Sequence, residues 1–224
     1  MSRETRTLIY ENPLASPEDI RSFILEGSAK LSFPNGRLRM ENQMDPGMGQ
    51  KANFVLWCDR NFPSDLEIEW DFWPLKEPGL CILFFAAQGR KREDLFDPAL
   101  SLRTGEYDAY HHGDIDAFHV SYFRRKWTEE RAFHTCNLRK SYGFHLVCQG
   151  ADPIPSVEDA LPPYPMQLRK WGPEITFTIQ GLPIFRWVDD GETYGPYLED
   201  GKVGFRQMAP LVAEYANLKV FSLK

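Results

Sequence analysis

The 224-residue sequence lacks the long apolar runs that signal peptides and membrane spans require. The opening stretch "MSRETRTLIYENPLASPEDI" contains no apolar core of signal-peptide length. No other window is apolar for long enough to cross a bilayer. We therefore expect cytoplasmic residence, unless another export route is used, and no membrane partner.

Cysteine is scarce, and the familiar catalytic motifs are missing. Cys58, Cys81, Cys136 and Cys148 lie far apart without a C-x-x-C pair, which argues against a disulfide framework and a zinc finger. There is no Gly-rich phosphate loop, nucleophile elbow or H-E-x-x-H motif. The sequence thus predicts no cofactor and no metal, and it predicts reduced cysteines.

One alternative stays open for Ca²⁺. The turn "VDDGETYGP" offers Asp189, Asp190 and Glu192 as oxygen ligands, although D-D-G is first of all typical of a hairpin turn.

Helix signals are also few. One start is convincing, with Ser16 as N-cap, Pro17 at the first position, and Glu18 and Asp19 in the first turn. The rest reads as about eleven or twelve short strands separated by turn residues. We therefore predict an all-β protein with one short N-terminal helix, folded as a single domain over residues 1–224.

Two strands carry clear patterns. "LEIEWDF" alternates acidic residues with apolar ones, which predicts one buried face. "GLCILFFAA" does not alternate and should be a central strand covered on both sides. The long loops 88–116 and 150–166 are expected to border one face of the sheet.

Charge is unevenly distributed. The chain has a formal net charge of -6 and a pI near 5.4, which disfavours nucleic acid as a partner. Residues 119–145, however, hold six cations and two acidic residues, and all five histidines lie within residues 111–145. Aromatic residues make up 14% of the chain, and several are threaded through this stretch. Such a segment suits an anionic ligand.

The strings "WDFWPLKEPGLCILFFAAQG", "RTGEYDAYHHGDIDAFHVSYFRRK" and "DDGETYGP…GKVGFRQMAP" resemble the YesU-like family of bacterial proteins, and the resemblance covers essentially the whole chain. It implies a concanavalin-A-like jelly-roll β-sandwich of two antiparallel sheets. It also implies a setting in the use of rhamnogalacturonan and related plant-wall polysaccharides. It implies no catalytic residue.

These observations together suggest a protein that binds acidic oligosaccharides, such as rhamnogalacturonan fragments, on its concave sheet face. The first hypothesis is that it is an enzyme that also processes them. The alternative is a non-catalytic, lectin-like protein with the same groove. A third interpretation is a solvated strand edge with no ligand. Pairing of two copies through the convex sheet stays an open alternative.

Two reactions, β-elimination and hydrolysis, fit an enzyme of this kind. In β-elimination a cation neutralises the uronate carboxylate, and His or Tyr groups move protons. Candidate catalytic residues are His119, His134, Tyr122 and Arg125. Candidate substrate-binding residues are Arg124, Trp127, Arg139, Tyr142, His111, His112, Arg206 and Gln207.

Strand alternation refines this set. It predicts that His119, Ser121, Phe123 and Arg125 share one face. Hydrolysis would need two carboxylates, and Glu67 and Glu69 have suitable spacing. The glucanase pattern E-x-D-x-x-E lacks its final Glu here, which disfavours hydrolysis.

Overall fold

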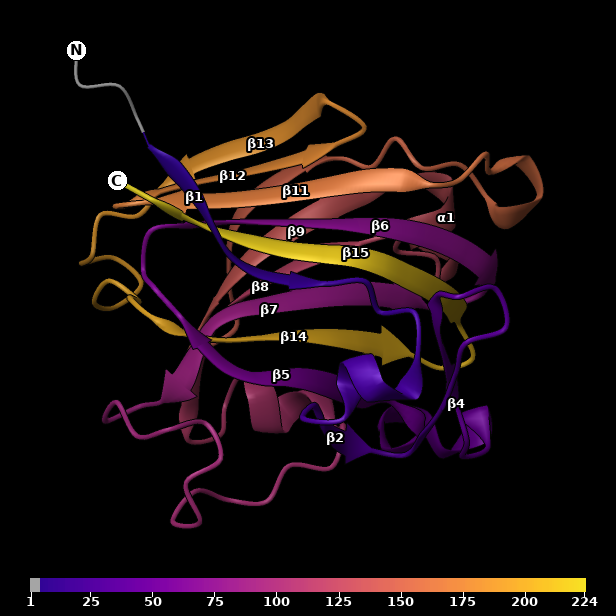
Figure 1. The fold of residues 1–224 in the computed structure, drawn as a ribbon, viewed down its shortest axis with the longest axis horizontal. Coiled ribbons are helices and arrows are strands. Elements are labelled where there is room, and N and C mark those ends of the chain that lie inside the picture. The colour runs from indigo at the N-terminus through magenta and orange to yellow at the C-terminus, as the bar shows by residue number, and fades with distance from the viewer. Residues whose placement is uncertain (1–4) are drawn as a thin grey trace.

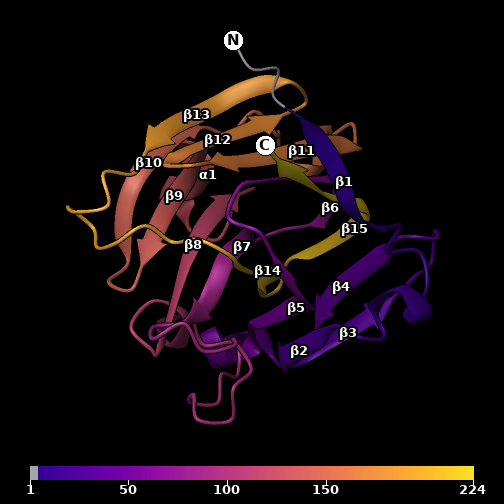
Figure 2. The same cartoon turned by 60° about the vertical axis from the view of Figure 1, so that its left-hand side comes forward.

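The computed structural model describes residues 5–224 and arranges them as two facing antiparallel sheets (Figures 1 and 2). In spatial order, sheet A consists of β13 (Leu182–Val188), β12 (Glu174–Ile179), β11 (Tyr164–Trp171), β6 (Leu66–Lys76), β15 (Val212–Leu223), β4 (Leu38–Asn42) and β3 (Ala29–Ser32), and β1 (Arg6–Asn12) pairs with β15. Sheet B consists of β10 (His145–Ala151), β9 (Thr135–Ser141), β8 (Ile115–Tyr122), β7 (Leu80–Gly89), β14 (Gly201–Met208), β5 (Phe54–Phe62) and β2 (Ile24–Gly27). The predicted all-β class with two antiparallel sheets is confirmed.

The helices are all short. They are the 3₁₀ helices η1 (Pro17–Ile20), η2 (Pro46–Ala52), η3 (Tyr107–Tyr110) and η4 (Val157–Asp159), and the α-helix α1 (Thr128–Ala132). The predicted start at Ser16 is confirmed, and the Asp19 carboxylate accepts a 2.8 Å hydrogen bond from the Ser16 backbone N–H. Helix α1 was not predicted, and it interrupts the basic stretch. Within residues 5–224 no helix is both long and apolar enough to cross a membrane.

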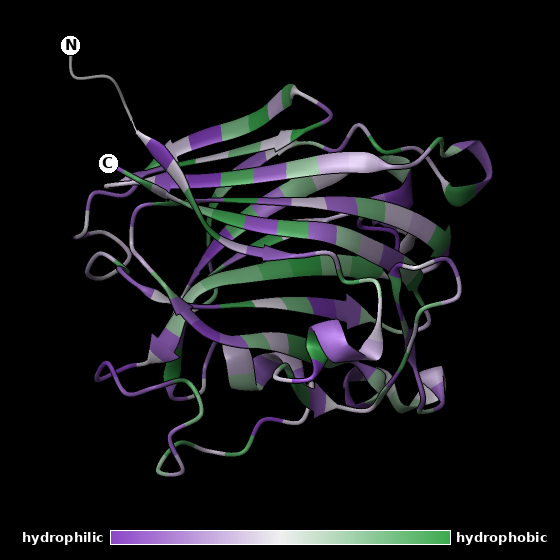
Figure 3. Cartoon of the chain, viewed as in Figure 1, coloured by the Kyte–Doolittle hydropathy of each residue, from purple (hydrophilic) through white to green (hydrophobic). Residues whose placement is uncertain are grey.

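The strand patterns explain the two layers. In β6, Ile68 and Trp70 are buried between the sheets while Glu69 and Asp71 lie on the outer face, as the alternation predicts. Strand β7 lies in the middle of sheet B, and its long apolar run stands out in Figure 3. It is buried on both faces, which confirms its prediction as a covered central strand.

The outer face of β7 is covered by the segment 90–114, which crosses sheet B. Tyr110 from this segment packs on Phe84 and Trp57, with ring centroids 5.4 and 6.4 Å apart. Gly204 leaves room for the indole, because a Cβ there would lie 2.4 Å from Trp57 Cε3. Together with Leu95 these side chains form a second apolar cluster, separate from the inter-sheet core.

A buried ion pair fixes the same segment. Arg103 Nη2 lies 2.7 Å from Glu26 Oε1 on β2, and both side chains are almost fully buried. Glu26 Oε2 also accepts a 2.9 Å hydrogen bond from Trp57 Nε1. Segment 90–114 is therefore held by charge and by packing, and it forms one layer of the molecule.

The other long loop does not lie on this face. Ile154 is buried in the inter-sheet core, and the Val157 N–H donates to Oε1 of Glu77, the residue directly after β6. The expectation that both long loops border one sheet face is therefore wrong for the Pro-rich loop.

Two predicted site residues lie inside the sandwich. The Tyr122 ring is fully buried between the sheets, 5.2 Å from the Phe72 ring. Gln207 faces the same core, and its Nε2 donates to the backbone oxygens of Met40 and Leu211 at 3.2 Å. Neither side chain can reach a ligand on the outer face, so the catalytic assignment of Tyr122 and the binding assignment of Gln207 are wrong.

The alternation of β8 fails just after Tyr122. Phe123 adopts a φ of 46° and turns its ring into the inter-sheet core. Arg125 is buried beyond it, where it contacts Asp152 at 3.4 Å and donates to the Ile154 oxygen. The prediction that Phe123 and Arg125 share the His119 face is therefore wrong, and Arg125 is a structural residue rather than a catalytic one.

We expect Arg125→Met to lower the free energy of unfolding by about 3–5 kcal/mol, because it leaves the Asp152 carboxylate buried without its cation. Urea denaturation followed by tryptophan fluorescence measures the change. The double variant Arg125→Met/Asp152→Asn should recover part of the loss, since no unpaired charge then remains. A single variant within about 1 kcal/mol of the wild type, as for an exposed pair, would contradict this assignment.

Candidate functional site

Arg206 lies on β14 beneath segment 90–114 and has no carboxylate partner among the described residues. Its Nη2 donates to Gln50 Oε1 and to the Gly105 oxygen at 3.1 Å, while Nε and Nη1 have no hydrogen-bond partner. The guanidinium lies 4.5 Å from the Tyr107 ring centroid. Burial lowers the pKa of Arg206 to about 10, which still leaves it cationic at neutral pH.

His119 lies between two hydroxyl groups. Its Nδ1 is 3.0 Å from the Tyr107 hydroxyl, and its Nε2 is 2.6 Å from Ser141 Oγ. Burial holds the pKa of His119 well below its usual range, so the imidazole is neutral at pH 7. Burial also raises the pKa of Tyr107 to about 12. In the neutral imidazole one ring nitrogen donates to its hydroxyl partner and the other accepts, so His119 links Tyr107 and Ser141 in one hydrogen-bonded chain.

Arg139 extends this polar cluster across β9. It pairs with His119 in the sheet register, and its guanidinium lies 3.8 Å from the Phe144 ring centroid. It donates to the Phe144 backbone oxygen at 2.9 Å, and no carboxylate among the described residues pairs with it. Arg139 and Arg206 thus place two unneutralised cations beside a neutral histidine.

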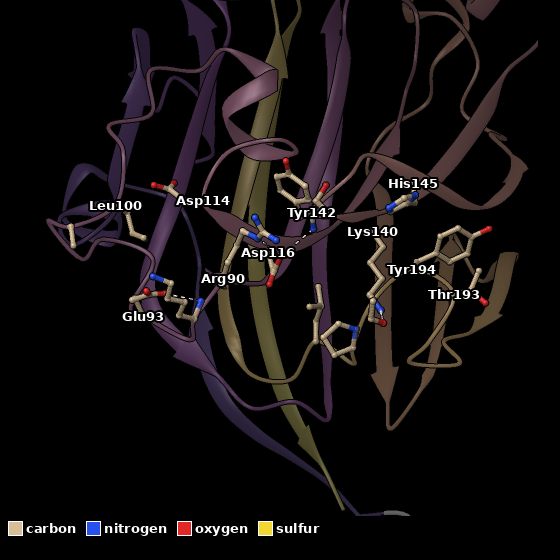
Figure 4. Close-up of a pocket in the computed structure, with 16 residues that line it drawn as sticks. Arg90, Glu93, Leu100, Asp114, Asp116, Lys140, Tyr142, His145, Thr193 and Tyr194 are labelled. Carbon is tan, nitrogen blue, oxygen red and sulfur yellow. Dashed lines mark hydrogen bonds and ion pairs between the residues drawn. The ribbon is translucent and has the colours of Figure 1, made fainter.

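A pocket of about 770 Å³ opens at the end of sheet B where β8 begins and β9 ends (Figure 4). Its walls come from residues 90–116, from the turn after β9 around Tyr142, and from residues 193–198. Segments distant in the sequence therefore meet at one opening.

Rings and charges of both signs line the pocket. Arg90 lies over the exposed Tyr142 ring at 3.9 Å, and its Nε is 3.9 Å from Asp116 Oδ1. Asp116 accepts a hydrogen bond from the Tyr142 N–H, and burial raises the pKa of its carboxyl. On the other side, the His145 and Tyr194 rings lie 5.0 Å apart. This mixture of flat rings and hydrogen-bonding groups is typical of a site for a polar ligand.

The acidic turn that the sequence offers to Ca²⁺ is instead tied to the sheet. Lys140 Nζ binds Asp189 Oδ2 at 2.7 Å and the Gly195 oxygen at 2.8 Å. Asp190 accepts a hydrogen bond from the Glu192 N–H, as in a hairpin turn. Because Lys140 already neutralises Asp189, this turn positions the pocket wall and the structure does not favour a Ca²⁺ site there.

Ser141 connects the pocket to the buried cluster. It lines the pocket, and its Oγ bonds His119. Ser141 is only 1% exposed, so the pocket borders a buried hydrogen-bonded pair of a hydroxyl and a neutral imidazole.

His111 and His112 lie close to the same opening. Their Nδ1 atoms are only 2.8 Å apart. Burial, with a smaller effect of His112, lowers the pKa of His111 to about 4. The His112 ring contacts Tyr142, at a centroid distance of 5.8 Å.

Three predicted residues lie at the opposite end of β8. Arg124 pairs with Glu130 at 2.6 Å, which neutralises it. Trp127 is exposed just before α1. His134 borders a separate hollow with Asp152. The structure therefore divides the basic stretch between the two ends of the sandwich and does not bring these residues to the pocket.

Sequence reasoning missed Tyr107, Ser141, Arg90 and Tyr194. Tyr107 and Arg90 belong to the long loop whose path the sequence does not define, and Tyr194 lies in a turn interpreted for Ca²⁺. Ser141 had a signal in the sequence, because it comes directly after Arg139 and Lys140 at the end of β9, the strand that pairs with the strand of His119.

The two carboxylates considered for hydrolysis lie on the outer face of sheet A, on the other side of the molecule. Glu67 and Glu69 both pair with Arg6. Burial raises the pKa of Glu67. No part of the pocket involves them.

Comparisons with known proteins agree with this architecture. A relative from Bacillus subtilis (strain 168), called "Uncharacterized protein YesU", is 53% identical over 212 residues, which cover 95% of this chain and 94% of the relative. A crystal structure of a Bacillus subtilis protein of unknown function with a galectin-like fold has a TM-score of 0.94 and 52% identity, and the match covers 100% of this chain and 99% of that one.

A more distant structure shares the fold. The κ-carrageenase of Pseudoalteromonas carrageenovora, solved with an oligotetrasaccharide of κ-carrageenan, has a TM-score of 0.59 at 9% identity, and the match covers 100% of this chain and 97% of that one. The family model described as "Domain of unknown function (DUF1961)" matches residues 7–220. The chain therefore belongs to the DUF1961 family.

Proposed function

We propose that this protein binds a uronate-containing oligosaccharide in the pocket at the end of sheet B. The observation that carries the proposal is Ser141, which lines the pocket and is bonded to His119 beside two arginines without carboxylate partners. Two cations that are not neutralised internally raise the local potential and favour an anion. The fold is one in which the κ-carrageenase holds an oligosaccharide.

The pocket supplies the contacts that a sugar needs. Tyr142 and Tyr194 offer ring faces, and Arg90 offers a planar fork for a carboxylate. The pocket volume of about 770 Å³ falls within the usual range for ligand sites. Fragments of rhamnogalacturonan taken up into the cytoplasm are the specific ligands that we propose to test.

The same groups fit β-elimination as a second candidate function. Arg90 would neutralise the sugar carboxylate, and Ser141 with His119 would take the proton from the adjacent carbon. The leaving oxygen would receive its proton from His145 or from water. What favours an enzyme over a binding protein is the close contact of His119 with both Ser141 and Tyr107. What favours non-catalytic binding is that His119 and Ser141 are each only 1% exposed.

For binding, we expect Tyr142→Ala to weaken the affinity for a uronate oligosaccharide by about tenfold, or about 1.4 kcal/mol, because it removes a ring face. Isothermal titration calorimetry measures the affinity. The matched control is Trp127→Ala, which removes another exposed ring at the far end of β8 and should change the affinity by less than about twofold. Equal losses in both variants would place the ligand elsewhere.

For elimination, we expect Ser141→Ala to lower the rate of double-bond formation by about 10²–10⁴-fold while leaving the affinity nearly unchanged. Ultraviolet absorbance and mass spectrometry follow the product. Because burial lowers the pKa of His119, the neutral base persists below pH 6.5, so the acid side of the rate profile should lie below that value. Binding without any product in the wild type would establish the lectin-like alternative.

A further inference from the structure

Three potential metal ligands converge where η3 ends, at the rim of the pocket. They are Asp108, His111 and His112, and they form the only group of three or more His, Cys, Asp or Glu side chains at such spacing in the part of the chain that the structure describes. His112 Nδ1 lies 3.2 Å from Asp108 Oδ1, and His111 Nδ1 lies 3.9 Å from the same atom. The two Nδ1 atoms are 2.8 Å apart.

The turn holds these side chains in place. The His112 backbone N–H donates to the Asp108 backbone oxygen at 2.8 Å, and the Gly143 backbone N–H donates to the His111 backbone oxygen at 2.8 Å. The His111 ring packs on Phe144, at a centroid distance of 4.2 Å. The end of η3 and the neighbouring turn at residues 142–144 therefore fix the backbone of both histidines and pack against their rings, and the two Nδ1 atoms lie close together.

The spacing suits a small tetrahedral ion. Ligand bonds of about 2.0–2.1 Å imply neighbouring ligand atoms about 3.3–3.4 Å apart in a tetrahedron. The three observed separations of 2.8, 3.2 and 3.9 Å have a mean of about 3.3 Å, and changes of about half an ångström in the shortest and the longest would complete the arrangement.

We propose that Asp108, His111 and His112 bind one divalent transition-metal ion, with zinc as the preferred ion. Two imidazoles and one carboxylate favour zinc and its neighbours over Ca²⁺ or Mg²⁺, which prefer oxygen ligands. Three protein ligands leave a fourth position for water or another oxygen.

The metal site lies next to the pocket, since His112 contacts Tyr142. A sugar carboxylate or hydroxyl in the pocket is a candidate fourth ligand. This last step rests on the proposed function, whereas metal binding itself does not.

The test uses tag-free, full-length protein, because a polyhistidine tag would itself bind metal. Zinc chloride is titrated by calorimetry, and cobalt chloride by visible absorbance, which reports the coordination geometry. We expect one zinc ion per chain with micromolar or tighter affinity, a tetrahedral cobalt spectrum, and a rise in the thermal unfolding midpoint with excess zinc.

Variants locate the ion. His112→Ala alters an exposed side chain, so it should fold normally and weaken zinc binding by about 30-fold or more; Asp108→Asn should weaken it by a smaller factor. The matched control is His145→Ala, which removes the imidazole on the opposite pocket wall and should leave zinc binding unchanged. No saturable binding by the wild type, or equal affinity in His112→Ala and the wild type, would overturn the proposal. Because these titrations contain no sugar, their failure would leave the proposed function standing.

Discussion

The packing of residues 90–114 against the outer face of sheet B is the constraint on which the rest of the structure depends. Tyr110 and Leu95 bury Trp57 and Phe84, which turns an exposed sheet face into a second apolar layer. The same layer buries Arg206, and several of its residues form one wall of the pocket. The stability of this region and the placement of its functional groups therefore have one physical origin.

The cationic stretch of the sequence has a divided role. Three of its cations form ion pairs with carboxylates of the fold. The pairs are Arg124 with Glu130, Arg125 with Asp152 and Lys140 with Asp189. Lys126, Arg131 and Arg139 donate instead to backbone oxygens. Among the arginines of this region, Arg139 and the distant Arg206 lie beside His119 without a carboxylate partner among the described residues, and Arg90 lines the pocket next to Asp116.

Much of the fold could be predicted, because strand periodicity is a local signal. The alternation in "LEIEWDF" and the apolar run in "GLCILFFAA" correctly placed β6 and β7. The site could be predicted only in part, since its geometry depends on distant contacts. The positive φ of Phe123 turns Arg125 inward, and no local pattern marks that turn. Tyr107 reaches His119 only because a long loop folds back over the sheet.

The pocket is proposed to bind an anionic sugar. The most direct test compares two affinities of the wild-type protein, one for a uronate oligosaccharide and one for its carboxyl-reduced, neutral counterpart. Both affinities are measured at a low and a high salt concentration. The account predicts that the uronate binds about tenfold more tightly at low salt, and that the difference shrinks as salt screens the arginines. Equal affinities for the two sugars, or no binding of either, would contradict it.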